Sequence, residues 1–167
     1  VLKRFSEILN VSKITNLKII ATAVLREATD TKPFIDEVEK LFKTKINILS
    51  GDEEAECSAE GVKIGFENVD GLVADLGGGS LELARVENNI VTNKTSLPFG
   101  VLRLLNNPIV KKKNLAKYIR KLLGEEKWLS KKKFNNLYLV GGTWRSLFKL
   151  HLFQNNHPVH IIHQYSI

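Results

Sequence analysis

An acidic residue followed by three glycines is the clearest chemical signal in the sequence. Asp75 ends an apolar run, and Gly77, Gly78, Gly79 and Ser80 follow it. Glycines let the backbone come close to a phosphate group and aim successive N–H groups at it. A carboxylate at the end of a strand can orient water or hold Mg²⁺, which prefers oxygen ligands. The pattern therefore favours a phosphate-binding loop over a plain tight turn.

This loop differs from two common phosphate motifs. No Lys-Ser or Lys-Thr pair follows it, as in a P-loop, and an alternating segment comes next where a dinucleotide-binding motif would have a helix. A second signal, Gly141-Gly142-Thr143, also ends an apolar strand but opens a helix. The free N–H groups of a helix N-terminus can bind an anion. An ordinary strand-to-helix turn is the alternative for this segment.

Two further segments contain charged residues at the ends of expected strands. Glu54 lies in the acidic segment that follows Ser50-Gly51, where acidic residues commonly cap a helix and interact with its dipole. Arg26 comes just after a buried strand and could clamp a phosphate, although a surface salt bridge is the more common role.

The surrounding pattern alternates between helix and strand signals. Strands are expected at 17–23, 46–49, 72–76, 81–86, 90–97 and 137–140. Helices are expected at 1–10, 23–26, 33–42, 52–65, 98–105, within 111–133 and at 142–152. Asn88-Asn89 between two strands is typical of a β-hairpin turn. The predicted fold class is α/β with mixed sheets.

Composition limits the class of protein. The 167 residues are 43% hydrophobic and 26% charged, which is typical of a soluble globular protein with one domain or two small lobes. No stretch reaches about 18 uncharged apolar residues, so we expect no membrane span. The single cysteine, Cys57, excludes an internal disulfide and fits a reducing, cytoplasmic location.

The net charge of +7 favours a polyanionic partner: nucleic acid, nucleotide or polyphosphate. Much of the excess falls in residues 111–133, where apolar residues at helical spacing predict an amphipathic helix. Its charged face is either simply solvated or a patch that guides anions.

Five ordered segments together resemble the exopolyphosphatase/guanosine pentaphosphate phosphohydrolase (Ppx/GppA) family of the actin–sugar kinase–Hsp70 superfamily. The segments are ATAVLREATD, ILSGDEEAECSAEGVKIGF, VADLGGGSLELARV, TSLPFGVLRL and LVGGTWRSLFKLH. The resemblance implies an α/β fold with ribonuclease-H-like, actin-type mixed sheets in two lobes and an active site in the cleft between them. Residues 1–67 would be the C-terminal part of the first lobe, and residues 68–167 the second lobe, truncated at its C-terminus.

The resemblance also implies roles for individual residues. Glu54 would be the base that activates the attacking water, and Arg26 a phosphate clamp. Asp75 and Glu82 would hold Mg²⁺. The implied phosphate-binding residues are Gly77, Gly78, Gly79, Ser80, Gly141, Gly142 and Thr143.

The implied activity is hydrolysis of the terminal phosphate of inorganic polyphosphate, guanosine pentaphosphate or both. Phosphoryl transfer needs cationic and N–H stabilisation of spread negative charge and an oriented nucleophile, as these residues could provide. The alternatives are a non-catalytic regulator that binds nucleotides or alarmones on the same scaffold, and a sugar or acid kinase of the superfamily. The resemblance suggests a homodimer for the full-length protein, and we expect no membrane or specific nucleic acid as partner.

The sequence departs from the family pattern in two places. Leu81 stands where Thr commonly follows the glycine loop, which removes one hydroxyl group. The family's first phosphate loop, a DxGSNS-type motif, does not occur in the sequence. We therefore expect a fragment that begins midway through the first lobe and is, by itself, inactive or weakly active.

Overall fold

The computed structural model describes residues 1–106, 114–130, 133–158, 161–164 and 166. Its contacts divide the chain into two units, Val1–Ser50 and Gly51–Ile167. The lobe boundary expected after residue 67 differs from this division, because the helix that begins at Gly51 packs on the sheet of the second unit.

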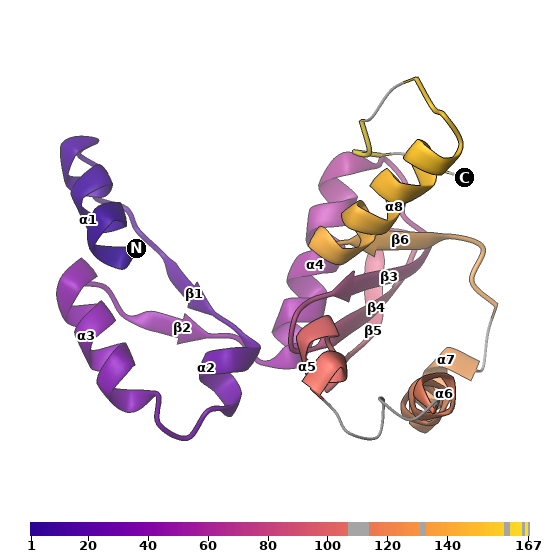
Figure 1. The fold of residues 1–167 in the computed structure, drawn as a ribbon, viewed down its shortest axis with the longest axis horizontal. Coiled ribbons are helices and arrows are strands. Elements are labelled where there is room, and N and C mark those ends of the chain that lie inside the picture. Colours follow the sequence, from indigo (N-terminus) through magenta and orange to yellow (C-terminus); the bar gives the residue numbers. More distant parts are fainter. Residues whose placement is uncertain (107–113, 131–132, 159–160, 165, 167) are drawn as a thin grey trace. The chain divides into compact units, whose positions relative to one another are not determined.

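The first unit is built around two short parallel strands. Strand β1 (Ile19–Ala21) pairs with β2 (Ile46–Ile48), with Ile19 opposite Ile46 (Figure 1). The helices of this unit are α1 (Leu2–Val11), α2 (Ala23–Glu27) and α3 (Lys32–Phe42). Pro33 lies in the first turn of α3, where its missing N–H group costs no helical hydrogen bond.

The second unit contains a four-stranded mixed sheet in the order β5-β4-β3-β6. Its strands are β3 (Gly71–Leu76), β4 (Leu81–Glu87), β5 (Ile90–Leu97) and β6 (Leu137–Val140). β3 and β6 are parallel, and the other two pairs are antiparallel. The helices are α4 (Gly51–Gly65), α5 (Val101–Asn106), α6 (Leu115–Glu125), α7 (Lys127–Ser130) and α8 (Gly142–Gln154).

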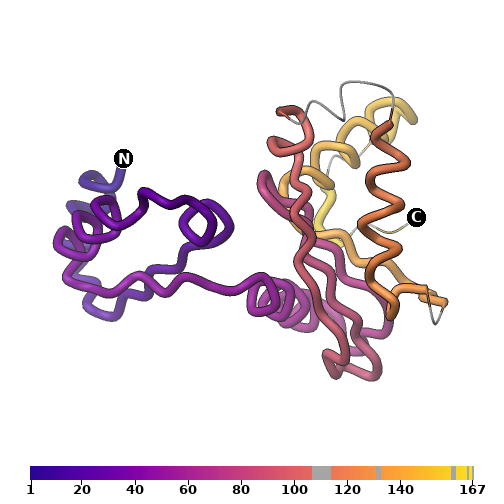
Figure 2. Tube along the Cα trace, turned by 90° about the horizontal axis from the view of Figure 1, so that it is seen from below, coloured from indigo at the N-terminus to yellow at the C-terminus, as the bar shows by residue number. Residues whose placement is uncertain are grey.

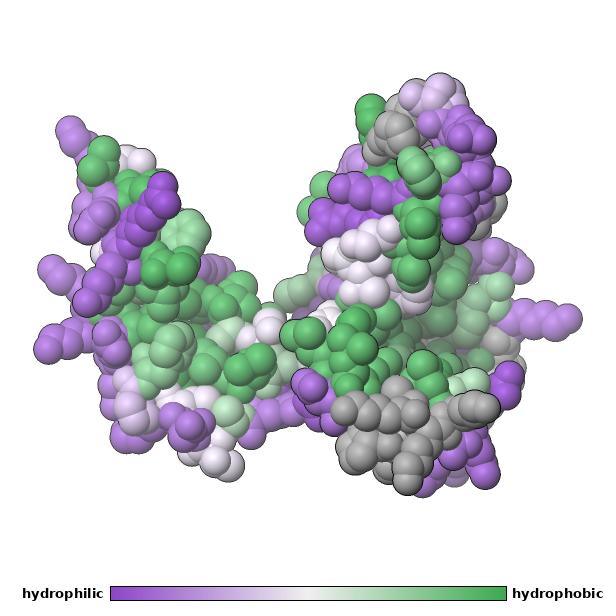
Figure 3. All heavy atoms as spheres, viewed as in Figure 1, coloured by the Kyte–Doolittle hydropathy of each residue, from purple (hydrophilic) through white to green (hydrophobic). Residues whose placement is uncertain are grey.

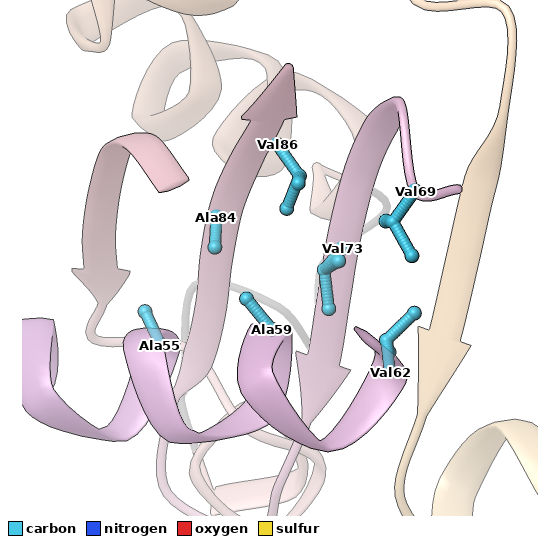
Figure 4. Close-up of a cluster of buried hydrophobic side chains, with 7 residues drawn as sticks. All are labelled: Ala55, Ala59, Val62, Val69, Val73, Ala84 and Val86. Atoms are coloured by element: carbon cyan, nitrogen blue, oxygen red, sulfur yellow. The ribbon is translucent and has the colours of Figure 1, made fainter. Parts of the chain in front are cut away.

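Helix α4 covers one face of this sheet with small apolar side chains. Ala55, Ala59 and Val62 recur at helical spacing and are buried. Figure 4 shows these three side chains pointing at four from the sheet region. The four are Val69, Val73, Ala84 and Val86. The alanines let α4 lie close to the strands, so that its polar residues can reach side chains of the sheet.

Helices α6 and α7 cover the opposite face. Tyr118, Ile119, Leu122 and Leu123 of α6 pack against the second core cluster, and Figure 2 shows α4 and α6 on opposite sides of the strands. The outer face of α6 is charged, as the sequence predicted. It carries the exposed residues Lys117, Arg120 and Lys121. The basic positions 111–113 and 131–132 lie outside the described residues.

The hairpin between β4 and β5 has the expected turn. Asn88 and Asn89 have φ angles of +50° and +64°, as a type I′ turn requires at both central positions. Further along the hairpin, a β-bulge shifts the register between Arg85 and Val86.

Helix α5 begins at Val101 rather than at Pro98, where the sequence had suggested its start. The first helical hydrogen bond runs from the N–H of Leu104 to the carbonyl of Gly100. Residues 98–100 instead bring the chain against the glycine loop.

Helix α8 has one side against the sheet and another that is exposed. Leu152 is fully buried, whereas Leu147, Leu150 and Phe153 are exposed. Apolar side chains are visible along α8 in Figure 3. No helix among the described residues is long and apolar enough to cross a membrane.

Candidate active site

A row of polar residues crosses the second sheet near the glycine loop. Asp75 of β3 lies opposite Glu82 of β4, and Glu82 lies opposite Ser96 of β5. Residues directly opposite each other in antiparallel strands point their side chains to the same face. This is the face that α4 covers, so the row lies beneath the helix.

Two residues in the first turn of α4 lie against Ser96 and Glu82 of this row. Gly51 lies against Ser96, where an added Cβ atom would be 2.2 Å from the Ser96 Cβ. The Glu54 carboxyl lies beside the Glu82 carboxyl, close enough to influence it electrostatically. Gly51 and Glu54 are three residues apart, close to one turn of a helix. Both contacts therefore come from the same face of α4.

A third residue on the same face of α4, Ser58, contacts Asp75. The Ser58 hydroxyl donates a hydrogen bond of 2.8 Å to Oδ2 of Asp75. Glu54 of the helix thus lies beside Glu82, and Ser58 of the helix beside Asp75, on two neighbouring strands of the sheet.

Glu82 is a buried acid with an altered protonation equilibrium. It is only 5% exposed, and the Ser96 hydroxyl donates a hydrogen bond of 2.8 Å to its Oε1. Burial raises the pKa of the Glu82 carboxyl, and the nearby charge and hydrogen bond of Glu54 raise this pKa further. The hydroxyls of Ser80 and Ser96 oppose this effect.

Asp75 is held from two sides. Its Oδ2 accepts the hydrogen bond from Ser58, and its Oδ1 lies against Gly141, where an added Cβ atom would be 2.6 Å away. Gly141 has a φ of +103°, a conformation that favours glycine. It is also the N-cap residue of α8, so the carboxylate lies beside the positive end of a helix dipole.

The glycine loop is anchored through its carbonyl groups. The Gly77 carbonyl accepts a hydrogen bond from the N–H of Val101 (3.1 Å), and the Gly78 carbonyl accepts one from the N–H of Leu102 (2.9 Å). In the described part of the chain, no backbone carbonyl accepts a hydrogen bond from the N–H of Gly78 or Gly79. The sequence suggested Gly77, Gly78, Gly79 and Ser80 for binding phosphate; of these, Gly77 donates its N–H to the Ser80 carbonyl (3.0 Å).

Parallel pairing brings the second glycine segment to the same edge. Val140, at the end of β6, lies opposite Asp75, so Gly141, Gly142 and Thr143 follow beside the glycine loop. The Trp144 indole N–H donates to the Ala74 carbonyl (3.1 Å) and ties the start of α8 to β3. Two strand ends that meet at one edge are a common location for ligand sites in α/β sheets.

Arg26 belongs to the first unit. Its guanidinium Nη1 donates a hydrogen bond of 2.6 Å to the carbonyl of Leu49. The contact ties the end of α2 to the segment that follows β2. The predicted role of Arg26 as a phosphate clamp stays a prediction.

Sequence reasoning missed three residues of this edge: Ser58, Ser96 and Gly100. Gly100 touches the glycine loop, where an added Cβ atom would be 2.3 Å from the Gly78 carbonyl carbon. Ser58 could have been found, because it lies one helical turn after Glu54. Ser96 and Gly100 are positioned by strand register and chain crossing, for which the sequence has no local signal.

No group of three or more His, Cys, Asp or Glu residues in the described ranges has the arrangement of a multi-ligand metal site. Mg²⁺ does not need such a group, because one or two carboxylates commonly bind it together with water and substrate phosphates. Asp75 and Glu82 provide two neighbouring carboxylates, which fits that donor set.

Comparison with known sequences identifies relatives. A model of the Ppx/GppA phosphatase family matches residues 1–166. A guanosine-5'-triphosphate,3'-diphosphate pyrophosphatase of Aeromonas hydrophila is 37% identical over 107 residues, covering 64% of this chain and 22% of that protein. A bifunctional 3-dehydroquinate synthase/phosphatase of Fusobacterium nucleatum is 35% identical over 120 residues, covering 65% of this chain and 18% of that protein.

Solved structures share the fold. An exopolyphosphatase from Cytophaga hutchinsonii superposes with a TM-score of 0.80 at 23% identity, covering 95% of this chain and 54% of that one. The Aquifex aeolicus member of the Ppx/GppA family superposes with a TM-score of 0.69 at 23% identity, covering 95% and 52%. The chain thus spans about half the length of these structures and about a fifth of the curated relatives. The predicted α/β fold, with ribonuclease-H-like mixed sheets in two lobes, is confirmed by this likeness.

Proposed function

The chain belongs to the Ppx/GppA phosphatase family, and from this membership we propose that the protein is a phosphohydrolase that releases a terminal phosphate from inorganic polyphosphate or guanosine pentaphosphate. The observation that carries the proposal is that Asp75 and Glu82 lie opposite each other on the two strands joined by the glycine loop, with Glu54 of α4 beside Glu82. The relatives' names, a guanosine pentaphosphate pyrophosphatase and an exopolyphosphatase, support the two substrate classes.

Glu54 is the proposed general base. It lies in the first turn of α4, is half-buried and lies beside the more deeply buried Glu82. A carboxylate in this position can take a proton from a water molecule as that water attacks phosphorus.

The proposed phosphate cradle consists of backbone N–H groups. The N–H groups of Gly78 and Gly79 can donate to the non-bridging oxygens of the phosphate that leaves. N–H groups of α5 hold the loop in place by hydrogen bonds to the loop's carbonyl groups. Fixed donors of this kind stabilise the negative charge of a phosphoryl-transfer transition state without further reorganisation. The N-terminus of α8, with Gly142 and Thr143, would bind a further phosphate group of the substrate.

Asp75 and Glu82 are the residues that would hold Mg²⁺. The ion would neutralise charge on the phosphate oxygens and orient the substrate. The carboxylates themselves are kept in place by hydroxyl groups, Ser58 for Asp75 and Ser96 for Glu82.

The experiment is Mg²⁺-dependent release of phosphate from long-chain polyphosphate and from guanosine pentaphosphate, with the complete natural polypeptide that contains this chain. We expect Glu54→Gln to lower kcat by about 10²- to 10⁴-fold, since general bases contribute rate factors of this size. The matched control is Glu60→Gln, which removes an exposed acid from the same helix and leaves kcat unchanged. The absence of release from either substrate, with both still bound, would favour the non-catalytic regulator.

A further inference from the structure

On the basis of the proposed hydrolase function, we infer that Ser58 is a positioning residue that orients the Asp75 carboxylate for metal binding. Nothing in the sequence motifs assigns a role to this serine. It lies in the middle of α4, one turn after the proposed base Glu54, on the face that is turned to the sheet.

The contact between Ser58 and Asp75 has the geometry of a strong hydrogen bond. The distance from Oγ to Oδ2 is 2.8 Å, both residues are half-buried, and the acceptor is a carboxylate. The terminal torsion of an aspartate is soft, so a free carboxylate rotates readily. A hydroxyl on Oδ2 and the Gly141 backbone against Oδ1 restrict that rotation from both sides.

The two carboxylates of the row differ in how many groups hold them. The Glu82 carboxyl accepts hydrogen bonds from the hydroxyls of Ser80 and Ser96. For Asp75, the Ser58 hydroxyl is the one side-chain hydrogen bond within the part of the chain that the structure describes. Loss of this single hydroxyl therefore leaves Asp75 without a side-chain donor, whereas Glu82 keeps the other hydroxyl when one serine is removed.

The orientation of Asp75 matters because its neighbour across the ladder is Glu82. Opposite residues in an antiparallel pair have Cβ atoms about 5 Å apart, a spacing at which two carboxylates can share one cation. Groups that orient metal ligands through a hydrogen bond commonly affect metal affinity by about 10- to 100-fold. Ser58 is placed to have this effect on Asp75.

The first test measures metal binding in the absence of substrate. Mn²⁺ serves as the probe, its free concentration is followed by electron paramagnetic resonance, and Mg²⁺ is the competitor. We expect Ser58→Ala to weaken Mn²⁺ binding about 10- to 100-fold and Ser58→Thr, which keeps the hydroxyl, to restore it to within about threefold. Ser130→Ala, which removes an exposed hydroxyl from α7, is the control and should leave binding unchanged.

The second test separates positioning from a purely structural role. In the phosphate-release assay, Ser58→Ala should lower kcat and raise the Mg²⁺ concentration needed for half-maximal rate, with the substrate KM changed less than about twofold. Unchanged Mn²⁺ binding in Ser58→Ala, or equal losses in the Ala and Thr variants, would overturn the inference. If the unsubstituted protein binds Mn²⁺ but releases no phosphate, the proposed function fails. The comparison of Mn²⁺ binding among the unsubstituted protein, Ser58→Ala and Ser58→Thr still decides the role of Ser58.

Discussion

Ser96 lies directly opposite Glu82 across the β4–β5 ladder, and its hydroxyl donates a hydrogen bond of 2.8 Å to Glu82 Oε1. This relationship depends on the β-bulge near Arg85. Beyond the bulge, each residue of β4 pairs one position later on β5 than the turn alone would place it. Without the extra residue, Thr95 would lie opposite Glu82 and Ser96 would point to the other face of the sheet.

Removing the Ser96 hydroxyl should destabilise the protein. Ser96→Ala keeps the Cβ atom that packs against Gly51 but leaves the buried Glu82 carboxyl with one donor fewer. We expect the free energy of unfolding at pH 7 to fall by about 1 to 3 kcal/mol, as for other hydrogen bonds to buried charged groups. Urea denaturation measures the change.

Thr95→Val is the matched control for Ser96→Ala. It removes a hydroxyl from the same strand, but this hydroxyl bonds to Glu126, which is less buried and also accepts a hydrogen bond from Trp128. Its cost should be smaller than that of Ser96→Ala, and equal costs would contradict the importance of the Glu82 contact.

Glu82→Gln should stabilise the protein at neutral pH. Burial and Glu54 raise the pKa of Glu82 in the folded state, so the folded protein binds this proton more tightly than the unfolded chain does. In the interval between the ordinary glutamate pKa and the raised pKa, stability therefore falls as pH increases, and it levels off above that interval. A glutamine side chain does not titrate, so it adds no pH dependence to the stability. Its carbonyl oxygen can still accept the hydrogen bond from the Ser96 hydroxyl.

Denaturation series from pH 4 to pH 8 measure this effect. The stability advantage of Glu82→Gln over the unsubstituted protein should be near zero at the acid end, increase through the interval, and level off above it. A difference that does not change with pH would show that Glu82 has an ordinary pKa. The same variant should lose most hydrolytic activity, since it lacks one of the two proposed metal carboxylates.

Gly141→Ala should damage both fold and site. The added Cβ would lie 2.6 Å from Asp75 Oδ1, and the φ of +103° is strained for alanine. We expect a loss of about 2 kcal/mol or more in stability. Gly142→Ala is the matched comparison for stability, because its Cβ would meet no atom within 4 Å. Calorimetry should show a lower Tm for the first variant and an unchanged or higher Tm for the second.

Gly100→Ala should disturb the glycine loop from outside. Its Cβ would come within 2.4 Å of the backbone of Gly78 and Gly79, which cannot move aside as a flexible side chain would. We expect the loop to shift and kcat/KM for phosphate release to fall by about 100-fold or more, since displacements of about 1 Å in a catalytic group have this effect. Gly124→Ala in α6 meets no atom within 4 Å and should stabilise its helix by up to about 1 kcal/mol without loss of activity. Full activity of Gly100→Ala would contradict the assignment of the loop.

Much of the fold was predictable because its signals are local. The apolar runs, the Asn88-Asn89 turn and the glycines after Asp75 and Val140 identified the strands of the second sheet and the loops that follow them. Where the second unit begins and where α5 starts depend instead on where a segment packs. The structure therefore differs here from the predicted boundary after residue 67 and the predicted helix start at Pro98. α4 joins the second sheet, and residues 98–100 cross to the glycine loop.

The sequence by itself indicated which residues could do chemistry: Asp75 by the strand end and glycine loop around it, and Glu54 and Glu82 by the resemblance to the family. Only the tertiary structure decided which of them meet and what holds them. One extra residue in the bulge turns Ser96 toward Glu82, and the close approach allowed by Ala55 and Ala59 brings Ser58 to Asp75. Both relationships depend on register and on the distance between layers, which are set by residues far apart in the chain.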